Sequence, residues 1–521
     1  MIKPRWFSGY NMLILLMLLL YTPLVIFGGF GTSDDLSLVA HIGPDYLQDL
    51  KYSLSRSGHI SRPIYGFVQS TSLHLFGGSY LLYGIFRLVL WGSLLCLAYA
   101  VFKKPLGNKT TLLFLYFLSF PIFSSSQLFN AMQLGYILSI IFYLLALKLV
   151  FDQKRKHNSS FYGVYFFWSL LALLSCEIVF PLFVFPLFVF WRNKKDTRLF
   201  KNISITTVAV FIVLLILKFI IGPLYQIGDD VYGFSFSSHS ILQGVYYIFA
   251  LCVEIPLLII EVIPFYFSEP LLWLSILVVP FIRSLKFELE IKQDKRIITA
   301  SISTILACSF IFILSDYPAV TYGLYNKMLL PSHLFIALIF SVLSVFMLRG
   351  KFYGFSYLLA VLWFGSMQMQ VINSIRSWGL RSKVFDDVTP VINAIENPND
   401  FVFVEVPYFL PTNYNNEPVF SLHDDFQGGL YLKGVTNPVK QTFPFSSKML
   451  KDKNYWPNHN ILNVIRSNNI EQVSCINTSN GLATLFRYKN IDAFRNARFS
   501  KVKVECPRAE LRSFISNSLF H

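Results

Sequence analysis

Long apolar runs recur along this chain and restrict its fold more than any other feature. Between residues 11 and 375, runs of about 20 residues follow one another, each long enough to cross a hydrocarbon core of about 30 Å as a helix. Only 14% of the 521 residues are charged and 54% are hydrophobic, whereas soluble domains carry about 25% charged residues. Within lipid, backbone polar groups are satisfied inside helices. The sequence therefore predicts a mainly α, polytopic transmembrane helical bundle.

The basic residues gather between the apolar runs rather than on one polar face. The net charge is +15, and short clusters of Lys and Arg stand at 103–104, 154–156 and 192–195. This is the positive-inside pattern, which sets the orientation of a membrane protein. Anionic lipid headgroups account for the basic excess, so we expect membrane lipids as partners and no nucleic acid.

The charge clusters and apolar runs together predict about eleven crossings. We expect a cytoplasmic N-terminus and an outer loop at 31–78. The predicted spans are 11–30, 79–102, 110–126, 131–151, 160–176, 178–191, 203–224, one crossing within 241–283, 297–314, 334–348 and 352–375. Two crossings within 241–283 would place the basic residues after it outside, so the remainder is expected to be re-entrant or interfacial. Glu254 and Pro256 interrupt that segment and require a protein-lined environment.

Residues 376–521 change character and contain no predicted span. We divide the chain into a transmembrane catalytic bundle, 1–375, and a C-terminal mixed α/β extramembrane domain, 376–521, on the periplasmic side. The segments 401–406 and 482–488 are typical of strands, and 388–395 and 455–467 are typical of helices. A segment of this length can bury a core. Cys475 and Cys506 form a disulfide if the compartment is oxidising, or remain two free thiols.

The outer loop 31–78 holds the most informative polar residues. Two adjacent carboxylates, Asp34 and Asp35, follow the first span directly. They either hydrate or cap the end of the helix, or form a functional pair at the membrane surface. The stretch DYLQDLKYSL (45–54) is typical of a helix lying on the membrane surface, and Arg56 and Arg62 add positive charge close by.

This arrangement resembles a known class of membrane enzymes. A first span, an acidic pair, a surface helix and the element SGHISRPIYG (57–66) resemble the membrane-embedded GT-C glycosyltransferases. Within that class, the chain is most similar to the glucosyltransferases that decorate bacterial O-antigen during serotype conversion. The resemblance covers the general plan of residues 1–375, and the sharper motif lies within 31–66.

The resemblance implies a function and a location. It implies a multi-pass protein of the bacterial inner membrane that moves a sugar, with glucose expected, from a polyprenyl-phosphate donor to a lipid-linked O-antigen or other envelope glycan on the periplasmic side. An Asp of the first loop, Asp34 or Asp35, acts as the general base, which requires an ionised carboxylate within hydrogen-bond reach of the acceptor hydroxyl. The sequence does not choose between the two.

The lipid phosphate that leaves in this reaction requires cations. Candidates on the outer side are Arg62, Lys327, Arg56 and Arg376. Lys327 stands in the late loop 315–333, where the resemblance implies a basic residue on the lipid phosphate, although Arg is expected there rather than Lys. A headgroup anchor is the alternative for Lys327, and a plain surface residue is the preferred interpretation of Arg56.

Two further candidates are polar residues at outer turns. Glu177 stands at the apex of a hairpin in an apolar stretch, where a carboxylate is either functional or hydrated. Gln133, with Gln127 and Asn130, either binds sugar hydroxyls or fills a polar turn. A second acidic pair, Asp229 and Asp230, raises the question of a divalent cation, but no spaced-ligand pattern supports one. We therefore expect neither a metal site nor a cofactor.

Two other functions remain as alternatives. An O-antigen polymerase or ligase also uses arginines in outer loops, but in large late loops. A polysaccharide-lipid transporter or flippase usually carries internal repeats and intramembrane charges. The polar residues of this chain concentrate in its outer loops, and this favours an enzyme.

Overall fold

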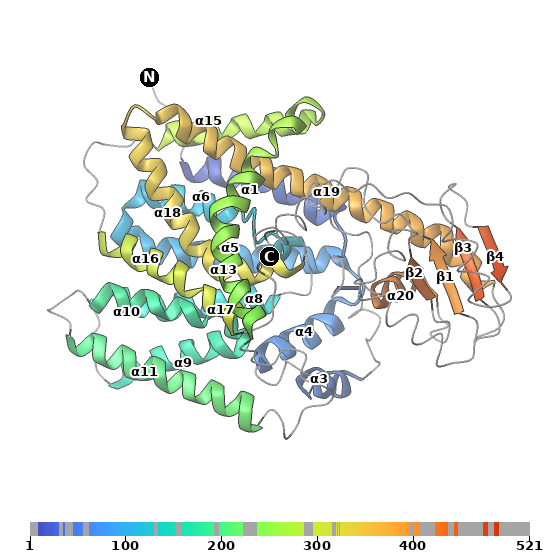
Figure 1. The fold of residues 1–521 in the computed structure, drawn as a ribbon, viewed down its shortest axis with the longest axis horizontal. Coiled ribbons are helices and arrows are strands. Elements are labelled where there is room, and N and C mark those ends of the chain that lie inside the picture. The colour runs from blue at the N-terminus through green and yellow to red at the C-terminus, as the bar shows by residue number, and fades with distance from the viewer. Residues whose placement is uncertain are drawn as a thin grey trace. The chain divides into compact units, whose positions relative to one another are not determined.

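The computed structural model shows a helical bundle followed by a small sheet (Figure 1). It describes residues 9–30, 35–36, 45–55, 62–129, 134–152, 159–191, 197–221, 224, 237–285, 295–314, 319, 321, 324–394, 401–405, 423–435, 442–445, 473–477 and 484–488. The chain forms two compact units. Unit 1 comprises 1–35, 41–378 and 412–417, and unit 2 comprises 36–40, 379–411 and 418–521.

Unit 1 is built from helices. Its first half contains α1 (Gly9–Phe27), α3 (Tyr46–Ser55), α4 (Pro63–Phe76), α5 (Tyr80–Leu106), α6 (Asn108–Ser119), α7 (Ser126–Phe129), α8 (Leu134–Phe151), α9 (Ser159–Ser175), η2 (Glu177–Phe183), α10 (Val184–Trp191), α11 (Thr197–Ile216) and η4 (Leu217–Ile221). Its second half contains α13 (Ser238–Phe249), η5 (Ala250–Glu254), α14 (Ile255–Ile260), η6 (Ile263–Phe267), η7 (Pro270–Leu277), α15 (Val278–Ser284), α16 (Lys295–Ala307), α17 (Ser309–Ile313), η8 (Leu324–Leu329), α18 (Leu330–Arg349) and the first part of α19 (Tyr353–Asn393), whose residues from 379 onward belong to unit 2.

Among the described residues, eight helices are long and apolar enough to cross a membrane by length and composition. Three shorter apolar helices, 160–175, 177–191 and 270–284, accompany them. The mainly α, polytopic architecture is thereby confirmed. The number of crossings and the orientation of the termini stay predictions.

The helical run 238–267 does not keep regular α geometry, and its sequence explains the interruption near Glu254 and Pro256. Pro256 has no N–H to donate to the preceding turn, and the turn before it, η5, adopts the wider π geometry. Glu254 ends that turn with its carboxylate buried and satisfied, because Tyr246 Oη and Thr321 Oγ1 each donate to it at 2.6 Å. The segment contains one candidate span of 30 residues, and the short helices η7 and α15 follow it. This matches the predicted division into one crossing and a shorter remainder. Whether the second part re-enters the membrane stays a prediction.

The last long helix continues beyond its apolar stretch. The span was predicted to end at residue 375, but α19 runs over 41 residues to Asn393. Loss of hydrophobicity does not stop a helix, since the segment after 375 contains no proline before Pro390 and most of its residues are tolerated in helices. Residues 388–393 of the helix predicted at 388–395 form the end of this same helix.

Unit 2 contains a four-stranded sheet in the order β2–β1–β3–β4. Strands β1 (Phe401–Glu405), β2 (Thr442–Phe445) and β3 (Val473–Asn477) are parallel, and β4 (Thr484–Tyr488) is antiparallel to β3. Helix α20 (His423–Leu432) lies between β1 and β2 in the chain, as a parallel crossover requires. The predicted strands at 401–406 and 482–488 are present as β1 and β4 over their described residues, 401–405 and 484–488. The predicted helix at 455–467 and Cys506 lie outside the described residues, so the disulfide stays a prediction.

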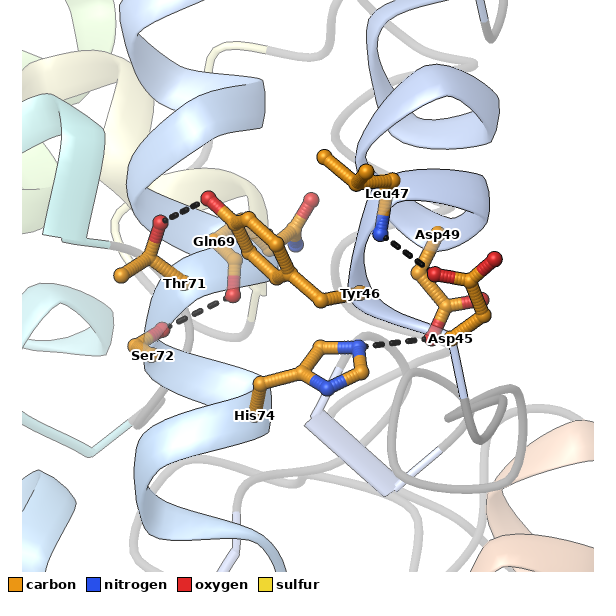
Figure 2. A network of polar contacts seen from close by, with 8 residues as sticks. All are labelled: Asp45, Tyr46, Leu47, Asp49, Gln69, Thr71, Ser72 and His74. Atoms are coloured by element: carbon orange, nitrogen blue, oxygen red, sulfur yellow. Dashed lines mark hydrogen bonds and ion pairs between the residues drawn. The ribbon is translucent and has the colours of Figure 1, made fainter.

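The helix predicted in the first loop is present as α3, and polar contacts attach it to α4 (Figure 2). The position of α3 on the membrane surface stays a prediction. His74 Nε2 lies 2.9 Å from Asp49 Oδ2, and the hydroxyls of Tyr46 and Thr71 are 3.0 Å apart. The Tyr46 ring also meets the edge of the His74 ring, with centroids 5.2 Å apart. These contacts fix α3 against α4, which begins beside Arg62.

We expect His74→Ala to loosen α3 without unfolding the bundle. The His74–Asp49 pair is partly exposed, and such pairs are worth about 0.2–1 kcal/mol. Hydrogen exchange of the α3 amides should therefore quicken by about 2- to 5-fold, because local opening is less costly. The matched control is His239→Ala on α13, an exposed histidine that should leave α3 unchanged. Equal exchange of α3 in both variants would contradict this role for the pair.

Candidate functional site

Arg62 and Glu177, two of the predicted site residues, form an ion pair in unit 1. Arg62 Nη2 donates to Glu177 Oε1 at 2.6 Å, and Nε donates to Oε2, so the pair is bidentate. Arg62 directly precedes α4, whose first residue is Pro63, a residue suited to the first position of a helix. Glu177 begins η2, directly after α9 and Cys176. The exposed fraction of the side chain is 7% for Arg62 and 18% for Glu177, so Glu177 is paired rather than simply hydrated.

The charge of Arg62 is maintained despite its burial. Burial alone works against the guanidinium charge, while the Glu177 carboxylate beside it favours that charge. The net effect raises the pKa of Arg62 well above its ordinary value. Arg62 therefore remains a cation at this site.

Lys327, in η8, brings a second buried cation. Its side chain is buried, and its Nζ lies 5.6 Å from the centroid of the Tyr136 ring, a cation–π distance. Tyr136 meets the edge of Tyr65 of α4 at 6.1 Å. A side chain at Gly135 would stand 2.0 Å from the Tyr65 ring, so glycine is required for this contact. A headgroup anchor would be exposed, which argues against that alternative for Lys327.

The charges of Arg62, Glu177 and Lys327 share one neighbourhood. Lys327 lies over Tyr136, which packs against Tyr65 of α4, and Arg62 directly precedes α4 and pairs with Glu177. Lys218 of η4 also acts on Glu177. We call Arg62, Glu177 and Lys327 the cationic cluster. Because it contains two cations and one carboxylate, it carries an excess of positive charge and suits an anionic ligand.

The connection between α6 and α7 lies against η8, and sequence reasoning did not select it. Asn326, next to Lys327, accepts a hydrogen bond from the Ser126 N–H at 3.0 Å and donates to Ser125 Oγ at 3.3 Å. Gln370 of α19 donates to the Ile122 carbonyl at 2.7 Å. The run SSSQ (124–127) between two apolar segments was a signal for this connection, but serines are common turn residues.

Asp35 is buried, with an exposed fraction of 0%. It acts electrostatically on Tyr83 of α5, whose hydroxyl donates to the Ser72 carbonyl at 3.2 Å. The interpretation of Asp35 as a hydrated helix end is therefore wrong, because no part of it meets solvent. Asp34, Arg56 and Gln133 lie outside the described residues, and their roles stay predictions.

Arg376 is paired with a different carboxylate. Its Nη1 and Nη2 donate to Glu269 Oε1 and Oε2 at 2.5 and 2.9 Å, and its side chain is 41% exposed. This pair satisfies both groups, with Arg376 more exposed than Arg62, and its part in phosphate binding stays a prediction. Among the residues that the structure describes, no group of three or more metal-ligating side chains occurs. Because Asp34, Asp229 and Asp230 lie outside them, the cofactor prediction is untested.

Comparisons with known proteins give only a distant likeness of fold. No family model matches the chain, and no curated protein matches it. Two solved structures of ArnT from Cupriavidus metallidurans are similar, each 10% identical, over 91% of this chain and 93% of that one. The one bound to undecaprenyl phosphate has a TM-score of 0.44, and the one in the apo state has 0.42. At these values the likeness bears on neither the substrate nor the mechanism of this chain.

Proposed function

We propose that this chain is a membrane glycosyltransferase that takes a sugar from a polyprenyl-phosphate donor. The sugar, expected to be glucose, passes to a lipid-linked O-antigen or other envelope glycan on the periplasmic side. The observation that carries the proposal is the buried cationic cluster, in which the Arg62–Glu177 pair and Lys327 come from separate segments of the chain and Tyr136 and Tyr65 pack between them. Cations are expensive to bury, and an anionic ligand is the simplest reason to gather them.

The charge change in the reaction favours such a cluster. The oxygen of the acceptor hydroxyl bonds to the anomeric carbon, and the bond from that carbon to the phosphate oxygen breaks. The hydroxyl proton passes to a base, and the electron pair of the broken bond stays on the phosphate. The phosphate of the donor is a diester with one negative charge. The released polyprenyl phosphate is a monoester and gains a second negative charge. Excess positive charge therefore stabilises the transition state more than the bound donor, which is what accelerates a reaction.

The three members of the cluster have separate tasks in this proposal. Arg62 has five N–H donors, and Glu177 takes two of them, which leaves three for the phosphate. Glu177 is a positioning residue, since its bidentate contact fixes the guanidinium plane. Lys327 supplies a point charge. Asp35, or Asp34 beside it in the chain, is the general base in this proposal.

We expect Lys327→Met to weaken the binding of polyprenyl phosphate by about 10- to 100-fold, because a hydrogen bond to a charged group is worth about 1.5–3 kcal/mol. Lys327→Arg keeps the charge and should retain most of the affinity. The measurement is a titration of the purified protein in lipid nanodiscs. Lys383→Met, which removes an exposed lysine of unit 2, is the control. An unchanged affinity in Lys327→Met would contradict the proposal, and tight binding by the wild type without sugar transfer would favour a transporter.

A further inference from the structure

We infer that Ser124, Ser126 and Gln370 form a subsite for the hydroxyl groups of a neutral hexose carried by the lipid phosphate. This inference rests on the proposed function, because it concerns the sugar of the donor that the cationic cluster holds. It adds the chemical class of the sugar and the residues that select it.

The first observation is a set of buried polar atoms that lack partners. Ser124 Oγ, Ser126 Oγ and Gln370 Oε1 are all buried and make no hydrogen bond within the part of the chain that the structure describes. The exposed fractions of these residues are 0%, 5% and 2%. Most buried polar atoms in folded proteins have a partner, and leaving one unsatisfied is costly. A ligand that supplies the missing partners removes that cost.

The second observation is that the three residues belong to, or are bonded to, one connection. Ser124 and Ser126 belong to the segment that joins α6 to α7, and Gln370 binds the Ile122 carbonyl of the same segment at 2.7 Å through its Nε2. That bond consumes a donor of the amide and leaves Oε1 as an acceptor. The two hydroxyls can each donate or accept. The set therefore matches sugar hydroxyls, which also do both.

The third observation is the position of this connection beside Lys327. Asn326 holds it through the Ser126 N–H and Ser125 Oγ, and Lys327 is the next residue in the chain. In a glycosyl phosphate, the sugar ring begins one oxygen away from the phosphorus. A phosphate held by Lys327 thus places its sugar close to the α6–α7 connection. Neutral donors and acceptors of this kind suit the hydroxyls of a neutral hexose.

Other buried serines lack partners for a more ordinary reason. Ser169 and Ser344 also have unsatisfied hydroxyls in the described structure, but each lies inside a long helix, α9 or α18. There the hydroxyl can rotate toward the carbonyl four residues earlier. Ser124 lies before α7, and Ser126 is its first residue, so neither has a helical carbonyl at that position. The two helical serines therefore serve as matched controls.

The test compares Ser124→Ala/Ser126→Ala with Ser169→Ala/Ser344→Ala. Dissociation constants are measured in nanodiscs for polyprenyl phosphate and for the same lipid carrying glucose, galactose or mannose. We expect the wild type to bind at least one hexosyl lipid about 10-fold more tightly than the bare lipid phosphate. Two lost hydrogen bonds should remove about 10-fold of affinity for that hexosyl lipid in the first variant. The affinity of Ser124→Ala/Ser126→Ala for bare lipid phosphate and its melting temperature should not fall. The control, Ser169→Ala/Ser344→Ala, should match the wild type in all these measurements.

The outcomes separate this inference from the proposed function. No gain in affinity with any hexose, or an equal gain in both double variants, overturns the sugar subsite while the binding of lipid phosphate stands. A wild type that binds neither the bare nor the hexosyl lipid overturns the proposed function, and the subsite with it. A loss of affinity for bare lipid phosphate in the Ser124→Ala/Ser126→Ala variant also contradicts the inference, because these hydroxyls are assigned to the sugar alone.

Discussion

Asp35→Asn is expected to reduce glycosyl transfer by about 10²- to 10⁴-fold, the usual contribution of a general base. Asn has the shape of Asp, but its side-chain amide cannot take up the proton of the acceptor hydroxyl. Asp35 is fully buried, so this isosteric change disturbs the packing less than a change in side-chain size would. The measurement is the initial rate of sugar transfer in membranes supplied with a polyprenyl-phosphate hexose and a lipid-linked acceptor glycan.

Two further variants make this result specific. Asp45→Asn changes an exposed carboxylate of the same loop, whose Oδ1 accepts the Leu47 N–H at 2.9 Å, and Asn retains that acceptor. Its transfer rate should match that of the wild type. Asp34→Asn asks which of the adjacent acids is the base. Full activity in both single variants and in the double variant would refute the assignment of the base to this pair.

Arg62→Met is expected to lower the free energy of unfolding by about 3–5 kcal/mol, because it leaves the Glu177 carboxylate buried without its partner. Transfer should be lost as well. The double variant Arg62→Met/Glu177→Gln removes both charges and should regain most of the stability. It should not regain transfer, because the guanidinium is absent. Chemical denaturation in detergent and the transfer assay measure the two effects separately.

The Arg376–Glu269 pair provides the matched comparison. It is bidentate like the first pair, but the exposed fraction of the side chain is 41% for Arg376 and 15% for Glu269. Arg376→Met removes a cation that water already reaches, so it should cost less stability than Arg62→Met. An equally small loss of stability in Arg62→Met, or recovered transfer in the double variant, would contradict the role given to the buried pair.

Hydropathy predicted the helical bundle because an apolar run long enough to cross a membrane has few alternatives to a helix. The ends of helices were harder to predict. Helix α19 extends to Asn393, since polar residues end an apolar stretch but not a helix. In unit 2, strands β1 and β4 were visible in the sequence as β-rich runs. Their parallel and antiparallel pairing depends on contacts that no local pattern reports.

The sequence selected members of the site but not their partners. Arg62 and Glu177 were chosen separately, one as a cation of the first outer loop and one as a carboxylate in an apolar stretch. A buried carboxylate requires a cation, but many cations in the chain qualify. Similarly, nothing in the sequence places Lys327 over Tyr136. The partnerships arise from packing between distant segments, and a single sequence does not record them.

Ordinary polar residues were the principal omission. Asn326, Ser124 and Ser126 resemble turn residues in the sequence, and only their burial without solvent gives them weight. Arg87 was also missed. It lies inside the apolar helix α5, buried, with Nη2 3.1 Å from the Tyr80 hydroxyl. A single cation within a predicted span is easily overlooked because the average hydropathy of the span hides it.

The central claim is that the buried cluster serves transfer of a sugar from a lipid phosphate. The most direct measurement supplies the purified wild-type protein with a polyprenyl-phosphate hexose and a lipid-linked acceptor, and counts both products. The claim predicts one polyprenyl phosphate released for each sugar joined to the acceptor, with both products falling together in Asp35→Asn and Lys327→Met. Binding of the donor by the wild type without release of lipid phosphate, for any hexose supplied, would contradict it.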